Sequence, residues 1–402
     1  MTGWRRLTDF LALRRNIVLL LAALVLAGTG ERLWLGFAPK YLETLGAGVL
    51  IIGLFDALQT LLGALYAYPG GWLTDRWGQR RSLLLFSALS LAGYVIVLLW
   101  QHWLALVLGA FLFLAWSAFS LPATFTVIAT SLDQRQHTMG VGVQSMVRRV
   151  PMMLGPLFGG WLITCFGWHE GVKLALLCCL VFGAFTMVFQ WFMAEPPAVS
   201  GDAPQSASHI SFPGVVKSFN STLRQLLVSD ILIRFCERIP YAFVILWAMN
   251  HGGVSAQQFG VLTAIEMATA MVCYIPVAHL AGKHGQRPFV LATFVFFTLF
   301  PLSLLWAHNF AWLAVAFVVR GLKEFGEPAR KALIIAQAPP ELRSRTYGAY
   351  YLIRDCTVTT GSFLGAWLWS ISPNANFIVA ALCGFGGTIW YWRFMQPSRP
   401  EQ

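Results

Sequence analysis

Several ionisable residues lie inside long apolar stretches of the chain, where a charge is costly to place. Glu31 and Arg32 occupy the middle of one stretch, Glu237 and Arg238 occupy the middle of another, and a charged segment begins at Arg320. A charge at the centre of a bilayer costs about 2.5 to 3.5 kcal/mol on insertion scales, so such side chains must face a cavity or a partner. These positions are candidates for binding a polar solute or for carrying a proton.

The segment from Arg320 to Lys331 carries the densest set of charges. If it forms one continuous helix, Arg320 and Glu324, Lys323 and Glu327, and Glu327 and Lys331 form pairs four residues apart on one face. This stripe cannot face lipid. Two interpretations remain open. The stripe lines a solute pathway, with Lys323 and Glu324 nearest the solute, or the pairs neutralise one another and only keep the cavity wet.

The two Glu-Arg pairs predict charged walls on both sides of a solute. Adjacent helical residues point about 100° apart, so only one member of each pair can face a central cavity squarely. The alternative is an ion pair that stabilises helix packing. Trp34 lies three residues after Glu31 on the same helical face and is a candidate stacking surface, although packing in the core explains it as well.

Two arginines further along the chain are candidates for binding an anion. Arg148 and Arg354 each lie around ten residues inward from the predicted edge of an apolar stretch, a depth of roughly 15 Å along a helix. Guanidinium groups suit carboxylate or phosphate through paired hydrogen bonds. The alternative is that each arginine pairs with a carboxylate such as Asp355 or Glu31.

Carboxylates inside the apolar stretches are the candidate proton carriers, because a low-dielectric cavity favours the protonated form. The sequence does not select among them. They are Glu31, Asp56, Glu237, Glu266, Glu324 and Glu327.

The elements that position these residues are predicted to be membrane-spanning helices. The chain has 402 residues, of which 57% are hydrophobic and 11% charged, whereas soluble domains contain about 25% charged residues. Twelve apolar stretches approach the roughly 20 residues that a spanning helix needs. The seven cysteines lack metal-ligand spacing, so neither a metal nor a cofactor is expected.

The net charge of +11 could indicate binding to nucleic acid. However, the basic residues cluster on alternate connectors, as the orientation of a membrane protein predicts, so no nucleic-acid partner is expected. This distribution places both termini in the cytoplasm. A polar stretch rich in Pro, Ser and Ala separates six predicted spans from six. We therefore expect a first bundle over residues 1–194, a cytoplasmic linker over 195–224 and a second bundle over 225–402.

The two halves of the sequence repeat one another. The segment from Pro69 to Arg81 recurs from Pro276 to Arg287, 207 residues later, and Glu31-Arg32 recurs as Glu237-Arg238 at an offset of 206. Same-direction repeats of this kind are typical of transporters with a central site between two bundles.

The sequence Gly71-x-Leu73-x-Asp75-Arg76-x-Gly78-x-Arg80-Arg81 resembles the signature loop of the major facilitator superfamily (MFS). The resemblance implies an all-α membrane protein with the MFS fold, in which 12 transmembrane helices form two six-helix bundles related by pseudo-twofold symmetry. It also implies alternating access and a cytoplasmic gate at the motif, formed by Gly71, Asp75, Arg76, Gly78, Arg80 and Arg81. In the second copy of the motif Gly282 replaces Asp75, so the gate should depend mainly on the first copy.

These observations predict a secondary transporter of the bacterial inner membrane, working as a monomer in the lipid bilayer. It would move a small organic, anionic solute coupled to protons, and the predicted solute-binding residues are Glu31, Arg32, Trp34, Arg148, Glu237, Arg238, Arg320, Lys323, Glu324, Glu327 and Arg354. The main alternative is proton-coupled drug efflux, because Gly155-Pro156-x-x-Gly159-Gly160 is similar to part of an exporter motif. A sensor without transport is a weaker alternative, and no enzyme motif is present.

Overall fold

The computed structural model describes residues 15–117, 147–193, 212–337 and 343–394, and every regular element in these ranges is a helix. The predicted all-α class is therefore confirmed. The chain divides into two compact units. Unit 1 comprises Met1–Gly48, Leu58–Gly201 and Ser255–Ala264, and unit 2 comprises Val49–Ala57, Asp202–Val254 and Ile265–Gln402.

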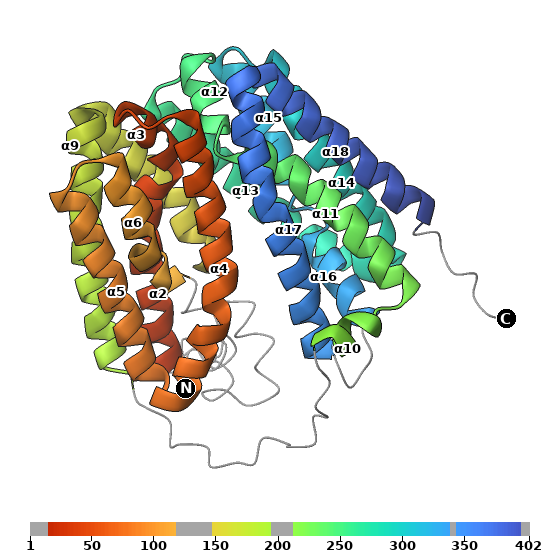
Figure 1. Ribbon diagram of the computed structural model, residues 1–402, viewed down its shortest axis with the longest axis horizontal. Coiled ribbons are helices and arrows are strands. Elements are labelled where there is room, and N and C mark those ends of the chain that lie inside the picture. The colour runs from red at the N-terminus through yellow and green to blue at the C-terminus, as the bar shows by residue number, and fades with distance from the viewer. Residues whose placement is uncertain (1–14, 118–146, 194–211, 338–342, 395–402) are drawn as a thin grey trace, which may run out of the picture. The chain divides into compact units, whose positions relative to one another are not determined.

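The helices of the first half of the sequence are long and mostly apolar. Their order in Figure 1 is α2 (Arg15–Trp34), η1 (Leu35–Phe37), α3 (Ala38–Thr44), α4 (Val49–Trp77), α5 (Gln79–Leu99), α6 (Trp103–Phe113) and α9 (Arg149–Trp191). The backbone of α9 turns at Gly167, where φ is 79°. This left-handed conformation suits glycine and divides α9 into two helical segments.

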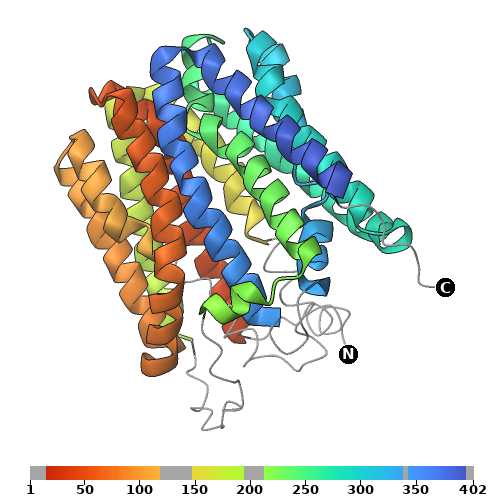
Figure 2. The ribbon, with the colours of Figure 1, turned by 45° about the vertical axis from the view of Figure 1, so that its right-hand side comes forward.

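The second half continues with helices of the same kind. They are α10 (Phe212–Lys217), α11 (Ser221–Tyr241), α12 (Val244–Asn250), α13 (Ala256–His284), α14 (Arg287–Trp306), α15 (Phe310–Leu322), α16 (Glu327–Ala336), α17 (Arg343–Ile371) and α18 (Pro373–Phe394). Within unit 2, α11 packs against both α17 and α18, which can be followed in Figure 2.

Among the described residues, six helical stretches are long and apolar enough to cross a membrane. They are Arg15–Thr44, Val49–Tyr66, Gln79–Leu99, Arg149–Trp191, Arg287–Trp306 and Pro373–Phe394. Two shorter apolar helices, Trp103–Ser117 and Phe310–Leu322, accompany them. Large apolar side chains such as Leu99, Trp306 and Trp392 are exposed, as a lipid-facing surface requires. The total of twelve spans stays a prediction.

The internal repeat is visible as the same close helix contact in both units. A Cβ atom at Gly159 of α9 would lie 1.7 Å from the Leu33 carbonyl oxygen of α2. At the repeat-related position, a Cβ atom at Gly365 of α17 would lie 2.1 Å from the Ile239 carbonyl oxygen of α11. Membrane helices pack closely where small residues let their backbones approach. Each glycine therefore sets the position of a helix that carries candidate site residues.

Candidate functional site

A buried network of charges occupies unit 2, and Asp230 of α11 lies at its centre. Its side chain is 1% exposed. One carboxylate oxygen, Oδ2, accepts hydrogen bonds from Arg330 of α16 and, at 3.1 Å, from the Tyr350 hydroxyl of α17. Arg354 Nη1 of α17 lies 3.5 Å from the same oxygen. Asp230 therefore joins three helices.

Glu327, the first residue of α16, extends the network. Its Oε1 accepts a hydrogen bond from Arg330 Nη2 at 2.6 Å, and its Oε2 accepts one from Arg330 Nε at 3.0 Å. Arg234 of α11 donates to Glu327 Oε2 at 3.1 Å and to Glu237 Oε2 at 2.7 Å. The expected contact between Glu327 and Lys331 is present at 3.7 Å.

The expectation of one continuous charged helix after Arg320 is wrong, because α15 ends at Leu322 and α16 begins at Glu327. Gly326 lies in this break. Its amide donates to the Thr293 hydroxyl, and a Cβ atom at this position would lie 2.2 Å from the Phe289 carbonyl oxygen, so only glycine allows this close approach. Glu324 lies in this break and is half-buried.

Arg320 and Lys323 consequently reach carboxylates on other helices. Arg320 Nε lies 3.2 Å from Glu266 Oε1 of α13. Lys323 Nζ donates to Glu237 Oε1 at 2.7 Å and lies 3.7 Å from Glu266 Oε1.

Every carboxylate of this network that is described above contacts at least two cations. Asp230 contacts Arg330 and Arg354; Glu237 contacts Arg234 and Lys323; Glu266 contacts Arg320 and Lys323; Glu327 contacts Arg234 and Arg330. Arg354 also binds Asp355, with 2.7 Å between Nη2 and Oδ1. This arrangement favours the interpretation in which the charges of unit 2 neutralise one another.

Three members of the network, Asp230, Arg234 and Arg330, are absent from the residues that the sequence predicts for the site. The spacing of Asp230, Arg234 and Glu237 could have found the first two, since positions i, i+4 and i+7 share one face of α11. The partner helices α16 and α17 follow from tertiary packing alone. Two buried atoms, Asp230 Oδ1 and Arg234 Nε, lack a hydrogen bond among the described residues and lie 3.8 Å apart.

Arg238 of α11 pairs with Asp56 of α4. The Nη2 atom of Arg238 lies 3.1 Å from Asp56 Oδ1 and donates to the Asp56 main-chain oxygen at 2.6 Å. Ser362 of α17 donates to Asp56 Oδ2 at 2.6 Å and accepts from Arg238 Nε at 3.1 Å. The Asp56 side chain is 3% exposed.

Among the described residues, unit 1 has fewer buried charged side chains than unit 2. Glu31 of α2 is buried, and the positive charges of Arg32 and Arg148 act on its carboxylate. Among the described residues, no carboxylate lies within 4.0 Å of either guanidinium group. Arg148 immediately precedes α9 and is exposed, whereas Arg32 is partly buried.

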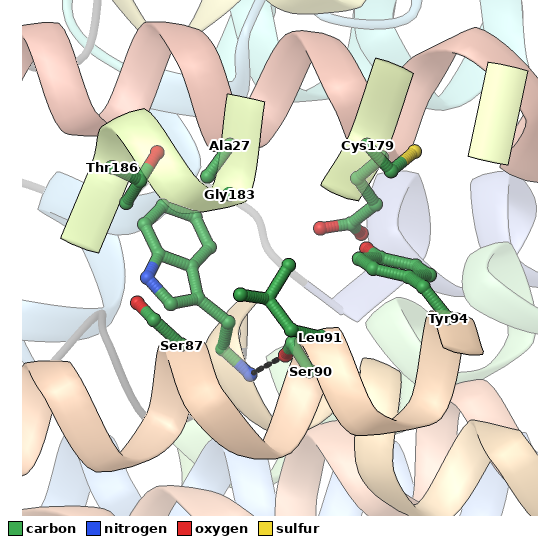
Figure 3. Close-up of a pocket in the computed structure, with 10 residues that line it drawn as sticks. Ala27, Ser87, Ser90, Leu91, Tyr94, Cys179, Gly183 and Thr186 are labelled. Atoms are coloured by element: carbon green, nitrogen blue, oxygen red, sulfur yellow. Dashed lines mark hydrogen bonds between the residues drawn. The ribbon is translucent and has the colours of Figure 1, made fainter. Parts of the chain in front are cut away.

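Glu31 borders a pocket of unit 1 that apolar and polar side chains line together (Figure 3), and its volume is about 320 Å³ when the adjoining open solvent is included. Ser87, Ser90 and Tyr94 of α5 and Thr186 of α9 contribute hydroxyl groups to its wall. The Ser90 hydroxyl accepts a hydrogen bond from the Trp116 amide at 3.0 Å. The pocket has room for one or two water molecules.

Trp34 lies in the core of unit 1 with 1% of its surface exposed. Its ring makes edge contacts with Phe113, at 5.1 Å between centroids, and with Tyr94, at 6.3 Å. In this conformation Trp34 packs within the bundle, which is the second of the two roles that the sequence leaves open.

The predicted gate residues lie at the junction of α4 and α5. Gly78 connects the two helices with a φ of 84°, which explains the glycine. The guanidinium carbon of Arg76 lies 5.3 Å from the centroid of the Trp72 ring, and that of Arg80 lies 4.6 Å from the centroid of the Trp191 ring. Arg81 is exposed. The surroundings of Gly71 and the side chain of Asp75 lie outside the described part of the structure.

The model of the Major Facilitator Superfamily matches residues 20–236 and 226–402 of this chain. The chain belongs to the major facilitator superfamily. Its predicted family and fold class are thereby confirmed, and its relatives are membrane transporters rather than enzymes.

Named relatives extend over nearly the whole chain. The multidrug resistance protein MdtG of Enterobacter lignolyticus is 24% identical over 381 residues, covering 90% of this chain and 87% of the relative. The crystal structure of the nucleoside transporter NupG superposes with a TM-score of 0.75 at 12% identity, covering 94% of this chain and 99% of NupG. The human organic anion transporter MFSD10 gives a TM-score of 0.65 at 16% identity, with coverages of 94% and 99%. These structural similarities show the fold alone.

Proposed function

We propose that this MFS transporter moves a small organic anion by proton-coupled alternating access. The two moving parts are the bundles formed by residues 1–194 and 225–402, joined by a cytoplasmic linker. The transporter works as a monomer in a bacterial inner membrane, with both termini in the cytoplasm. The predicted positive-inside distribution of Lys and Arg supports this orientation.

The observation that carries the anion proposal is the unequal charge balance of the two units. In unit 2, the network carboxylates neutralise Arg234, Arg320, Lys323 and Arg330. In unit 1, Glu31 is the carboxylate on which the charges of both Arg32 and Arg148 act. Neither arginine forms an ion pair with a described carboxylate. A guanidinium group with free donors suits a carboxylate or phosphate on the solute.

A stability screen of the purified protein against small probes of known charge tests this assignment. The probes are succinate, glucose 6-phosphate and the cationic dye ethidium, each followed by thermal unfolding. We expect at least one anion to raise the melting temperature and Arg148→Ala to remove that increase. The exposed Arg393 on α18 supplies the control, because Arg393→Ala deletes the same charge elsewhere.

Two results would contradict the anion proposal. One is stabilisation of the wild type by ethidium but by neither anion. The other is an anion response that Arg148→Ala and Arg354→Ala both retain in full. For an anion that binds, counterflow in proteoliposomes then measures transport directly.

Drug efflux is the second candidate function, and it has an observation of its own. MdtG proteins named for multidrug resistance match the chain at 22 to 24% identity. The ethidium arm of the same screen tests this candidate, since a drug exporter should bind the hydrophobic cation.

A further inference from the structure

The contact between Asp56, Arg238 and Ser362 joins three helices through one carboxylate. Arg238 on α11 binds the Oδ1 and main-chain oxygens of Asp56, and Ser362 on α17 donates to Oδ2 at 2.6 Å. All three side chains are largely buried, and that of Asp56 is 3% exposed. We call this group the latch. It holds the first part of α4 against α11 and α17 within unit 2.

The latch coincides with a division of α4 between the two units. Val49–Ala57 belongs to unit 2 by its contacts, whereas the helix from Leu58 onward belongs to unit 1. Gly53 permits the close approach, since a Cβ atom there would lie 2.4 Å from Ala366 Cβ on α17. Asp56 lies seven residues after the start of α4, about 10 Å along the helix. The predicted topology places this start on the non-cytoplasmic side.

In unit 1, the repeat-related helices α13 and α9 also approach closely at a glycine, but no carboxylate stands at the position equivalent to Asp56. There, Gly260 of α13 takes the place of Gly53, and its Cβ position lies 2.2 Å from the Pro156 carbonyl oxygen of α9. Thr263 stands at the position equivalent to Asp56, and Pro156 at the position equivalent to Ser362. Arg32, the equivalent of Arg238, is thus left without this carboxylate. Both copies of the repeat therefore have the close helix contact, and only the copy in unit 2 also has the carboxylate that forms the latch.

We propose that Asp56 carries the coupling proton and that its protonation opens the latch. The proton comes from water on the non-cytoplasmic side and binds a carboxylate oxygen of Asp56. Asp56 becomes neutral and Arg238 keeps its charge, so their ion pair is lost. Among the described residues, the Tyr241 ring also faces the latch, 4.9 Å from the Arg238 guanidinium carbon, and the Arg320 guanidinium carbon lies 5.7 Å from the same ring. This inference rests on the proposed proton coupling and names its residue.

Hydrogen exchange of the protein in detergent, read by mass spectrometry, tests the latch directly. The peptides are those covering residues 49–57 and 358–366, compared at pH of about 5.5 and about 7.5 after correction for intrinsic exchange rates. In the wild type we expect exchange at least about fivefold faster at the lower pH. In Asp56→Asn it should be fast at both values. Ser362→Ala, which keeps both charges, should exchange faster than the wild type at the higher pH and retain the pH response.

The matched control is Asp355→Asn, which removes a carboxylate seven residues from Ser362 on α17 and should keep the wild-type pH response. Exchange in the wild type that does not depend on pH would overturn the proposal, and so would a pH response that Asp56→Asn retains. No solute is needed in this experiment. Either contradicting result of the probe screen would therefore overturn the proposed solute class and leave the latch result standing.

Discussion

Replacing Asp230 with Asn should destabilise unit 2 more than the loss of any exposed ion pair. The substitution keeps the size of the side chain and an acceptor for Tyr350, but it removes the charge between Arg330 and Arg354. Removing one partner from a buried ion pair costs about 3 to 5 kcal/mol. Here Arg330 retains two hydrogen bonds to Glu327, so we expect about 3 kcal/mol, at the lower end of this range.

Thermal unfolding in detergent, followed by intrinsic tryptophan fluorescence, measures this loss. One kcal/mol corresponds to roughly 2 to 4 °C for a domain of unit 2's size, which predicts a decrease of about 6 to 12 °C for Asp230→Asn. The matched control is Asp355→Asn. Its carboxylate also binds Arg354 but is 33% exposed, and exposed pairs contribute about 0.2 to 1 kcal/mol.

The difference in melting temperature between the two variants shows whether the buried network stabilises unit 2. If Asp230→Asn melts within about 2 °C of Asp355→Asn, the buried network does not contribute to stability as calculated from typical buried pairs. The additional variant Asp230→Leu separates the effect of a lost charge from that of a lost hydrogen bond. It should be at least as destabilising as Asp230→Asn, because Tyr350 then loses its acceptor as well.

Further predictions concern helix packing and the gate. Gly159→Ala should lower the melting temperature, because its Cβ atom would lie 1.7 Å from the Leu33 carbonyl oxygen, and overpacking costs about 1 to 3 kcal/mol. Gly63→Ala, with nothing within 4 Å of its Cβ position, should be neutral or stabilising, and equal losses in both variants would contradict the packing argument. Asp75→Asn should reduce proteoliposome uptake of the stabilising anion more than Gly282→Ala does. Uptake by Asp75→Asn at the wild-type rate would refute the predicted asymmetry of the gate.

The fold class could be predicted from the sequence, and the repeated helix contacts leave a signal in it, for a physical reason. Apolar length specifies helices in a membrane, and glycines at a fixed offset mark where backbones meet. Gly159 and Gly365, spaced by 206 residues, make the same contact to Leu33 and Ile239 in the two units. The apolar length of a helix is local in the sequence, and the glycine contacts repeat at a constant interval.

The partners of the charged residues could not be predicted in the same way. Spacing along one helix suggested that Arg320 would bind Glu324, but the helix breaks after Leu322, and Arg320 reaches Glu266 of α13 instead. The repeat likewise suggested equal roles for Arg32 and Arg238. Only Arg238 has a carboxylate at the right place, because Asp56 is present in one copy of the repeat.

The charge network of unit 2 also constrains the order in which this protein is assembled in the membrane. Asp230 on α11 is synthesised about a hundred residues before Arg330, and its neutralising partners on α16 and α17 do not yet exist when α11 leaves the ribosome. Asp and Arg at the centre of a helix each oppose insertion by about 2.5 to 3.5 kcal/mol. Arg234 on the same helix lies 3.8 Å from Asp230, but we expect stable integration of α11 to depend on the later helices as well. A chain truncated before α16 would leave α11 poorly inserted and open to quality-control proteolysis.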